Sequence, residues 1–478
     1  MKARHLIALA TSLATAVLSV STAAAAQSRF DSTRPDVLVV GGTPAGVAAA
    51  VAAARRHQRV TLVVAGEDLG GILTDGLMNQ WDLNVTSAGT PVQRGLFAEI
   101  YGKLGDAFAP AAASDVFADM VANEANVAVR YGEVAAGVAP SEWPDGRHID
   151  TVMVKNVSSN TMVVIRSPLV VDATDSGNIA AMAGARYDLG RQDTGIDERM
   201  QAVTEMFTLE GVRWDDVVSG YDAAKFGPGG ATNRTAWGYA KLMRDYKPVL
   251  QNAVVRDLNF GRMADGSVSV NAIDIVGIDG LDPQQVEQAK RNTTVEAPHL
   301  VEFLRSHLAG FADARVGRFA SSVYVRETRH IDGLERLTSS DVWNGKIPSD
   351  SVGLASYPID VHPVDVSDQP AFASTRHVYG IPFGALVPQG IDNVILAGPA
   401  ISATHEAAGS ARIIPTTIEE GEAAGAAAAY ANDHHLDFPQ IAMNHERVAA
   451  LRRDLAAKGA LVGGPVLTAT HPPERRKK

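Results

Sequence analysis

Apolar residues form short unbroken runs near the start of the chain. Asp36–Val40 and Arg59–Val64 are rich in valine and leucine, a pattern typical of strands buried on both faces of a parallel sheet. The alanine-rich segment Val47–Arg56 lies between them and favours a helix. A strand, a helix and a second strand in this order predict a βαβ unit, and such units bind dinucleotides in doubly wound α/β proteins.

Similar patterns continue along the chain. Thr151–Arg166 alternates apolar and polar positions, as a hairpin with one covered face does. Pro415 begins a helical pattern, where a proline costs little because the first N–H groups of a helix have no partner within it. The other expected elements are a helix at Pro91–Leu104, strands at Val127–Tyr131, Leu169–Asp172, Ile381–Leu386 and Asn393–Gly398, and helices at Pro415–Ala431 and Met443–Lys458.

The alternation of strands and helices is lost between Tyr187 and Val378. Charged helical segments, a loop at Phe226–Gly230 and isolated strands such as Ser267–Ile275 follow one another there. A chain of 478 residues is also too long for one ordinary core. We therefore expect an α/β protein in which a mixed α+β substrate domain, residues 187–378, is inserted into a Rossmann-like domain of residues 27–186 and 379–432, followed by a C-terminal helix and tail at residues 433–478.

The first 26 residues have the pattern of a signal peptide. Lys2 and Arg4 supply a short positive region, Leu6–Val20 an apolar region, and Ala24–Ala26 a cleavage site of small residues. The apolar region is short for a membrane span. We expect cleavage near Gln27 and export, with the periplasm as the destination, and a retained N-terminal anchor is the alternative.

Charge and composition narrow the function. The formal net charge is −11, which argues against a nucleic-acid partner, because binding of phosphates requires a basic face. The chain contains no cysteine, so disulfides, thiolate metal sites and cysteine nucleophiles are excluded. We expect no stable membrane insertion after signal cleavage.

A glycine-rich turn joins the first expected strand to the first helix. Gly41 permits the tight turn, Gly46 permits close packing of the helix on the strand, and the start of the helix presents free N–H groups to a pyrophosphate. Thr43 occupies the place of the second glycine in the usual motif.

The acid that normally binds the ribose hydroxyls is missing from its usual place. Val64 ends the second strand, where an aspartate or glutamate is expected. Glu67 and Asp68 follow in the next turn, and either could supply the carboxylate. The glycine-rich segment Asp68–Gly76 then lets backbone approach a ligand closely.

Five longer blocks have a more specific order of residues. They are VVGGTPAGVAAAVAAAR (Val39–Arg55), LGGILTDGL (Leu69–Leu77), VVDATDSGNIAAMAGA (Val170–Ala185), VRETRHIDG with ASYPIDVH (Val325–Gly333 and Ala355–His362), and the segment Asn393–Gly425. Through these blocks the chain resembles the FAD-dependent oxidoreductase family of bacterial exported and polysaccharide-associated flavoproteins, within the larger glutathione-reductase-like FAD fold. The resemblance covers residues 36–460 and implies an FAD-dependent enzyme.

The resemblance implies that FAD lies along the first βαβ unit, with its ring near the last block. A helix that begins near Pro415 would then point its positive end at the pyrimidine edge of the flavin. The expected cofactor-binding residues are Gly41, Gly42, Thr43, Pro44, Ala45, Gly46, Glu67, Gly70, Gly71, Ile72, Leu73, Thr74, Val134, Ala173, Thr174, Asp175, Gly398, Gly409, Ser410 and Arg412.

The candidate catalytic residues lie in the second half of the chain. His405, beside Glu406, is the first candidate for the base that takes the substrate's proton, and a structural histidine is its alternative. Asp360 and His362 alternate along an expected strand, so they would share one face and could act as an acid–base pair. Arg326 could contact the substrate, or could form a buried ion-pair network with its charged neighbours.

These features predict a flavin-dependent dehydrogenase or oxidase. Its substrate would be a small polar molecule, including a carbohydrate derivative, and its electron acceptor is not identified by the sequence. We expect no metal ion, because the acidic and histidine residues have no clear ligand spacing. The alternatives are a flavin monooxygenase or reductase that uses NAD(P)H, and a flavin-binding protein without catalysis.

Overall fold

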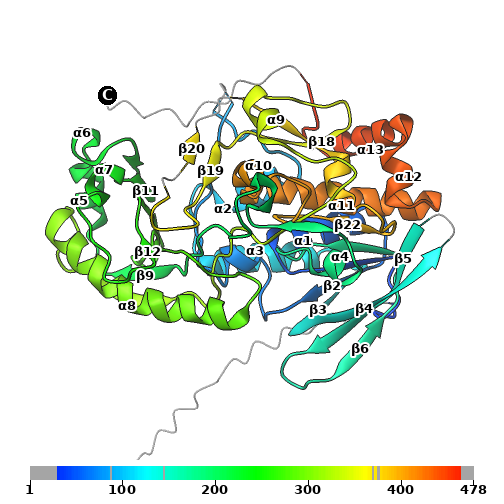
Figure 1. Ribbon diagram of the computed structural model, residues 1–478, viewed down its shortest axis with the longest axis horizontal. Coiled ribbons are helices and arrows are strands. Elements are labelled where there is room, and N and C mark those ends of the chain that lie inside the picture. Colours follow the sequence, from blue (N-terminus) through cyan, green and yellow to red (C-terminus); the bar gives the residue numbers. More distant parts are fainter. Residues whose placement is uncertain (1–29, 87–88, 144–145, 369–370, 374–376, 465–478) are drawn as a thin grey trace, which may run out of the picture.

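A parallel sheet forms the centre of the molecule. The computed structural model describes residues 30–86, 89–143, 146–368, 371–373 and 377–464, and the expected signal peptide lies outside these residues. All pairings within this sheet are parallel, as the unbroken apolar runs predict. The strands, in spatial order, are β22 (Val394–Leu396), β7 (Leu169–Asp172), β1 (Val37–Val40), β2 (Val60–Val64) and β3 (Val127–Tyr131) (Figure 1).

Two helices from opposite ends of the chain pack closely beside this sheet. They are α1 (Pro44–Ala54) and α11 (Ile414–His434). Gly421 and Gly425 lie one turn apart on α11. A Cβ atom at these positions would lie 2.1 Å from the carbonyl oxygen of Ala45 and 2.2 Å from that of Ala49. The two backbones therefore touch, and only glycine fits at these positions of α11.

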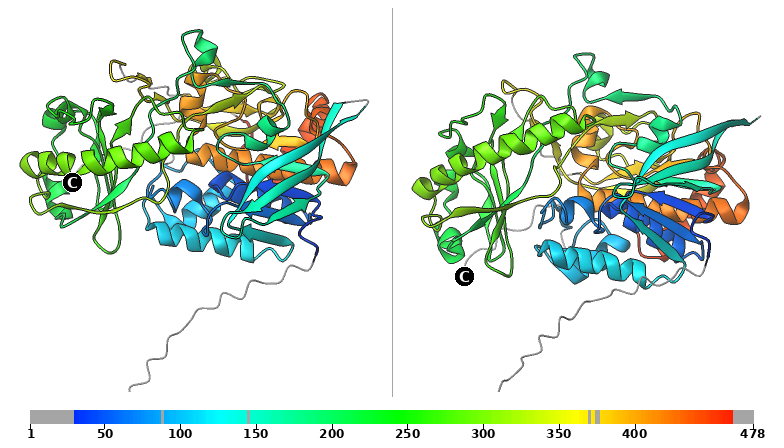
Figure 2. Two further views of the ribbon diagram at one scale, coloured as in Figure 1. Left: turned by 60° about the horizontal axis from the view of Figure 1, so that its bottom comes forward. Right: turned by 90° about the horizontal axis from the view of Figure 1, so that it is seen from below.

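A second, antiparallel sheet lies beside the parallel one and has its own apolar core, which includes Phe207, Phe260 and Phe311 (Figure 2). The long helix α8 (Pro283–His307) packs against it. Its strands, in spatial order, are β10 (Gly230–Ala231), β11 (Thr235–Gly238), β13 (Leu258–Arg262), β14 (Val268–Asn271), β9 (Phe207–Glu210) and β16 (Arg315–Phe319).

The remaining elements surround these two sheets. The expected hairpin at Thr151–Arg166 is confirmed as part of a three-stranded antiparallel sheet of β4 (Glu133–Trp143), β5 (Gly146–Asn156) and β6 (Met162–Ile165). The other helices are α2 (Leu96–Leu104), α3 (Pro110–Ala122), α4 (Asn178–Met182), α5 (Trp214–Gly220), α6 (Ala223–Phe226), α7 (Ala240–Met243), α9 (Ser339–Asn344), α10 (His405–Ala411), α12 (Phe438–Ala442) and α13 (His445–Ala457). The other strands are β8 (Tyr187–Leu189), β12 (Ala253–Val254), β15 (Asp274–Ile275), β17 (Arg329–Ile331), β18 (Ser351–Ala355), β19 (Ile359–Val361), β20 (Ala371–Ala373) and β21 (Tyr379–Pro382).

Three expected elements differ from the structure. The strand expected at Ile381–Leu386 is wrong: β21 ends at Pro382, which has no N–H for a longer ladder, and a 3₁₀ turn follows. The strand expected at Ser267–Ile275 is divided, because β14 and β15 belong to different sheets. The helix expected from Pro91 begins only at Leu96, after Gly95 with a φ of +57°. None of the helices in the described part of the chain is long and apolar enough to cross a membrane.

Candidate functional site

The glycine turn after β1 forms a tight cradle at the start of α1. Gly41 has a φ of +124°, and a Cβ atom there would lie 2.2 Å from the carbonyl oxygen of Ala173. A Cβ atom at Gly46 would lie 1.8 Å from the carbonyl oxygen of Gly41. Glycine is therefore required at both positions. The turn leaves the positive end of α1 open to an anionic group.

Thr43 has a structural role that explains its place in the turn. Its hydroxyl donates to the carbonyl oxygen of Ala173 at 3.0 Å and accepts from the N–H of Gly46 at 3.1 Å. Thr43 is thus the N-cap of α1 and also joins β7 to the turn. The threonine in place of the usual glycine therefore stabilises the cradle and does not disrupt it.

The second glycine-rich loop lies directly on this cradle. The N–H of Gly70 donates to the carbonyl oxygen of Gly42 at 2.8 Å, and Gly70 and Gly71 both have positive φ. Val64 fills the space beside Gly42, where a Cβ atom would lie 2.5 Å from a Val64 methyl group. The loop 70–74 and the turn 41–46 therefore form one continuous backbone surface.

The segment after β7 completes the cradle. The N–H of Ala173 donates to the carbonyl oxygen of Val40 at 2.9 Å. Asp172 accepts from the Thr174 hydroxyl at 2.6 Å and from the N–H of Ala180 at 3.0 Å. Asp175 is exposed, and the protein around it raises its pKa to about 6.

Residues of the last block, Asn393–Gly425, contact one another and also pack against β19 and Tyr357. Gly398 has a φ of +110°, and its N–H donates to Glu420 at 3.0 Å. Gly409 packs on the backbone of β19, since a Cβ atom there would lie 3.1 Å from the carbonyl oxygen of Asp360. The Ser410 hydroxyl donates to the carbonyl oxygen of Tyr357 at 2.5 Å. These contacts fix α10 on β19, and the expected contacts of these residues with a cofactor stay predictions.

His405 belongs to a buried cluster of one glutamate and two histidines. Its Nδ1 lies 2.7 Å from Oε1 of Glu327, and Nε2 of His330 lies 2.8 Å from the same oxygen. The two imidazoles lower the pKa of Glu327 to about 2 against the effect of burial. Burial lowers the pKa of His405, but the hydrogen bond that its Nδ1–H donates to Glu327 outweighs burial and raises that pKa. Glu406, in contrast, is exposed.

A larger group of buried charges connects the second sheet region with the region around α10. We call it the charge network. Arg256 donates to Asp360 at 2.7 Å, and Nδ1 of His362 lies 2.8 Å from Asp274. Its members are Arg256, Asp274, Arg326, Asp360, His362 and Arg412.

Arg326 and Arg412 both have partners inside the charge network, although the buried Nε atom of each has no hydrogen-bond partner among the described residues. Arg326 is 2% exposed and pairs with Asp274 at 3.3 Å, so of the two interpretations of Arg326 the structure shows the ion-pair network. Arg412 donates to the Tyr324 hydroxyl at 2.7 Å and to the carbonyl oxygen of Asp360 at 2.9 Å. The nearby Asp365 pairs with Arg199, at 2.7 Å.

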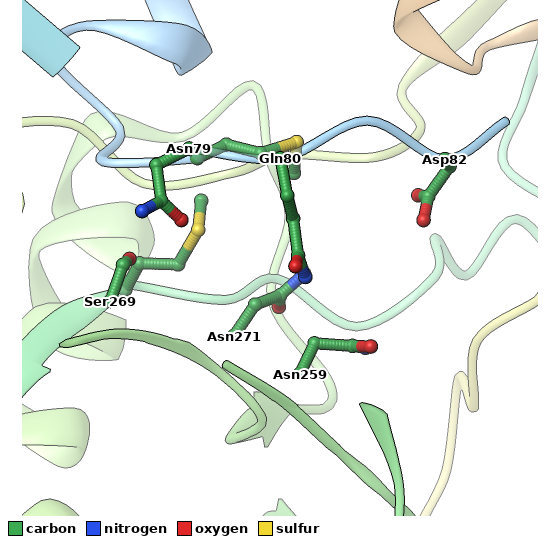
Figure 3. Close-up of a pocket in the computed structure, with 8 residues that line it drawn as sticks. Asn79, Gln80, Asp82, Asn259, Ser269 and Asn271 are labelled. Carbon is green, nitrogen blue, oxygen red and sulfur yellow. The ribbon is translucent and has the colours of Figure 1, made fainter. Parts of the chain in front are cut away.

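A polar recess lies between the second glycine-rich loop and the second sheet (Figure 3). Its volume is about 310 Å³ when space open to solvent is included, of which about 20 Å³ can hold the centre of a water molecule. The segment that forms one wall is fixed on the sheet, because Asn79 donates to the carbonyl oxygen of Gly261 at 3.0 Å and Ser269 donates to that of Leu77 at 2.7 Å. We call it the amide recess, and it is lined by Met78, Asn79, Gln80, Asp82, Met206, Asn259, Ser269 and Asn271.

The model of the family of FAD dependent oxidoreductases matches residues 36–455, which include the cradle, both glycine-rich loops and α11. The chain belongs to this family. It is an FAD-dependent oxidoreductase of mixed α/β fold, and its cofactor is FAD. No curated protein matches the chain.

Solved structures that resemble this FAD-dependent oxidoreductase are distant in sequence. Identities of 10–13% and TM-scores below 0.5 carry no argument about the substrate. One is a geranylgeranyl bacteriochlorophyll reductase-like protein from Thermoplasma acidophilum (13% identity, 89% of this chain and 87% of that chain, TM-score 0.43). Others are p-nitrophenol 4-monooxygenase PnpA from Pseudomonas putida DLL-E4 (12%, 88% and 88%, 0.42) and the flavin-dependent brominase Bmp2 (10%, 88% and 84%, 0.44).

The cradle of this FAD-dependent oxidoreductase fits its cofactor. Cβ atoms would fill the turn at Gly41 and Gly46, which is the feature that lets a pyrophosphate approach backbone N–H groups. Residues 70–74 extend this surface. Arg412 is two residues from the start of α11, whose positive end would face the flavin ring. The contacts of Val134, in β4, and of the residues after β7 with FAD remain predictions.

We predict that Glu67, and not Asp68, binds the ribose hydroxyls of FAD. The Asp68 carboxylate already accepts from the Ser114 hydroxyl at 2.7 Å, whereas Glu67 is exposed and has no hydrogen bond within the described residues. Loss of one hydrogen bond to a charged group costs about 1.5 kcal/mol or more, so Glu67→Gln should raise the Kd for FAD roughly tenfold. Fluorescence titration of the apoprotein measures this. Asp68→Asn is the control, and a larger effect of that variant would contradict the assignment.

The structure adds candidate site residues that the sequence did not indicate. Asp82, Tyr357, Arg256 and Asp274 lie in or beside the charge network and the amide recess. Asp82 lies shortly after the LGGILTDGL block, and this position could have identified it as a candidate site residue. Nothing in the sequence pattern indicated Asn259 in β13 and Asn271 in β14, because their role depends on the contact between this sheet and the segment Met78–Asp82.

Proposed function

We propose that this FAD-dependent oxidoreductase is a dehydrogenase or oxidase that takes a hydride from a small polar molecule bound in the amide recess. The observation that supports this most is the lining of the recess. Gln80, Asn259 and Asn271 contribute carboxamides to the recess, beside Asn79 and Ser269, whose donors hold the wall on the sheet. Figure 3 shows Gln80 extending from its segment toward Asn259 and Asn271.

The lining favours a neutral substrate with hydroxyl groups, such as a carbohydrate derivative. A carboxamide both donates and accepts, as a hydroxyl group does, so a set of carboxamides complements neighbouring hydroxyls. No lysine or arginine is among the described residues that line the recess. Arg256, Arg326 and Arg412 are held by partners in the charge network. The recess therefore has nothing to neutralise a carboxylate or a phosphate.

One wall of the recess follows the cofactor cradle directly along the chain. The cradle loop 70–74 continues through Leu77 into Met78–Asp82, which forms one wall of the recess. FAD, when bound, supplies the hydride acceptor. The residues of the chain hold the substrate by its hydroxyl groups and keep it in one orientation between this wall and the strands β13 and β14.

The test is the absorbance spectrum of the purified holoprotein, recorded without oxygen during titration with neutral sugars and polyols, with the corresponding sugar acids, and with amines. We expect neutral polyhydroxylated compounds to bleach the flavin bands. Bleaching only by sugar acids would contradict the assigned substrate class. Bleaching by NADPH alone would instead support a monooxygenase or reductase.

Asn271→Leu should raise the half-saturating concentration of the compound that bleaches the flavin by about tenfold or more. The leucine leaves a hydroxyl group of the bound compound without a hydrogen-bond partner. Gln288→Leu, which replaces an exposed amide of α8, is the matched control and should leave that concentration unchanged. Equal values for both variants and the unaltered protein would place the substrate outside the recess.

Two further parts of the proposal rest on the sequence pattern. We propose that residues 187–378 are a domain inserted into a glutathione-reductase-like FAD domain, and the separate apolar core around Phe207 and Phe260 supports this. We also propose export to the periplasm after cleavage near Gln27. N-terminal sequencing of the protein recovered from the periplasm tests the cleavage, and a sequence that begins at Met1 would contradict it.

A further inference from the structure

Asp82 combines two properties that rarely occur together. Its side chain is exposed, yet it lies at the amide recess, where protein surrounds it. Figure 3 shows Asp82 on the same segment as Asn79 and Gln80, with its carboxylate on the side of that segment that faces the strands of the second sheet. A carboxylate in this place can reach a molecule in the recess without first breaking a buried ion pair.

The position of Asp82 is fixed by its neighbours. The Tyr357 hydroxyl lies close enough to the carboxylate to lower the pKa of Asp82. The amide of Asn84 donates to the carbonyl oxygen of Ser356, which joins the two segments directly beside this contact. Ser410, on α10, holds the backbone of Tyr357 from the other side.

The electrostatic surroundings adjust Asp82 for proton transfer near neutral pH. Desolvation by the surrounding protein and the negative charge of Asp360, in β19, raise the pKa of Asp82 to about 6. Arg412 at the end of α10, the Tyr357 hydroxyl and His362 act in the opposite direction. A general base is most effective when its pKa is close to the working pH.

The other titratable groups of the region are less suited to this role. The Nδ1 of His405 is bound to Glu327, and only 6% of the residue is exposed. Asp360 is paired with Arg256, which together with His362 and Arg412 holds its pKa well below the usual range. Glu205 has a pKa raised to about 7, but it is only 4% exposed, and the charges that act on it are Lys290 and Glu287.

We propose that Asp82 is the catalytic base that accepts the hydroxyl proton of the substrate, while Tyr357 holds its carboxylate in place. This inference rests on the proposed function. As the O–H proton moves to the Asp82 carboxylate, the C–O bond would become a carbonyl, and oxidised FAD, when bound, would supply the acceptor for the C–H hydrogen and its electron pair. The substrate is oxidised by two electrons, and the proton later leaves Asp82 for solvent through the open side of the recess.

The test is the rate of anaerobic flavin reduction by the compound that bleaches the unaltered holoprotein, measured from pH 5 to pH 9. We expect the rate of the unaltered protein to rise through a pKa of about 6. Asp82→Asn should lower it by about 10²–10⁴-fold and remove that inflection, with FAD content unchanged. Glu205→Gln is the matched control and should keep both the rate and the inflection. An Asp82→Asn protein that is reduced at the normal rate, or that retains the inflection, would overturn the proposal.

A second readout does not depend on turnover. A carboxyl group whose pKa is raised by folding destabilises the fold once it is ionised. The Tm of Asp82→Asn should therefore exceed that of the unaltered protein at pH 8, and the two should converge near pH 4. Equal Tm values at both pH values would show that Asp82 is not held as the structure indicates, and would overturn the proposal. If no compound reduces the unaltered protein, the proposed function fails instead, and the Tm comparison still decides the state of Asp82.

Discussion

Gly421→Ala is expected to destabilise the protein by about 3 kcal/mol, because overpacking against backbone cannot be relieved by a rotation of a side chain. The new Cβ atom would lie 2.1 Å from the carbonyl oxygen of Ala45 and 2.9 Å from its Cα atom. Ala45 is in the first turn of α1, and we predict that this turn presents its N–H groups to the pyrophosphate. The same variant should therefore also bind FAD more weakly. Urea unfolding and a fluorescence titration with FAD measure the two effects.

The control is another glycine within a helix. Gly102 lies in α2, and no atom lies within 4 Å of the position of an added Cβ atom. Gly102→Ala should stabilise the protein by roughly 0.5–1 kcal/mol, since alanine is the better helix former. The two substitutions are chemically identical, so opposite signs can only come from the contact between α1 and α11. If both variants stabilise the protein, the close packing of the two helices is wrong.

The cofactor cradle could be predicted because its determinants are local in sequence. Gly41, Gly46 and the flanking apolar runs lie within one βαβ unit, so their spacing alone specifies a turn and a helix start. The reason for Thr43 could not be predicted, because its hydroxyl binds Ala173, which is 130 residues away. Likewise, Val64 is explained only by its contact with Gly42 in the folded chain.

The amide recess was beyond the reach of the sequence for a related reason. Asn79 meets Gly261 across 182 residues, and the register of β13 with β14 decides which asparagines face the loop. Polar residues at the ends of short strands can have many roles. Which role they have depends on the tertiary contact between the second sheet and the segment that packs on it. The sequence left two interpretations of Arg326 open, substrate contact and an ion-pair network, and did not identify its partner Asp274.

His405 was expected as a base, and its contacts now allow a decisive experiment on Glu327. Glu327 is 3% exposed and accepts from His405, from His330 and from the N–H of Gln201 at 3.0 Å. Replacing one member of a buried ion pair leaves the other without compensation, so Glu327→Gln should destabilise the protein by about 3 kcal/mol or more. Urea unfolding of the holoprotein at several pH values measures this loss.

The loss should depend on pH with a definite sign. The pKa of Glu327 falls from its usual 4.5 to about 2 on folding, so its contribution is present above pH 4.5 and is lost as the pH falls through about 2. The pKa of His405 is raised above its usual 6.5, so that contribution is complete below pH 6.5 and is lost as the pH rises through the raised value. The difference between the unaltered protein and Glu327→Gln should therefore be largest between pH 4.5 and 6.5.

Glu406→Gln is the matched control for this experiment. Glu406 is exposed and adjacent to His405, so its loss should change the free energy of unfolding by less than about 0.5 kcal/mol at any pH. Equal losses in the two variants would mean that the glutamate–histidine cluster is not buried as the structure has it. A large loss of stability only in Glu327→Gln would show that the cluster supports the fold. If a folded His405→Gln protein also reduces its flavin at the normal rate, His405 has a structural role, and Asp82 remains the candidate for proton transfer.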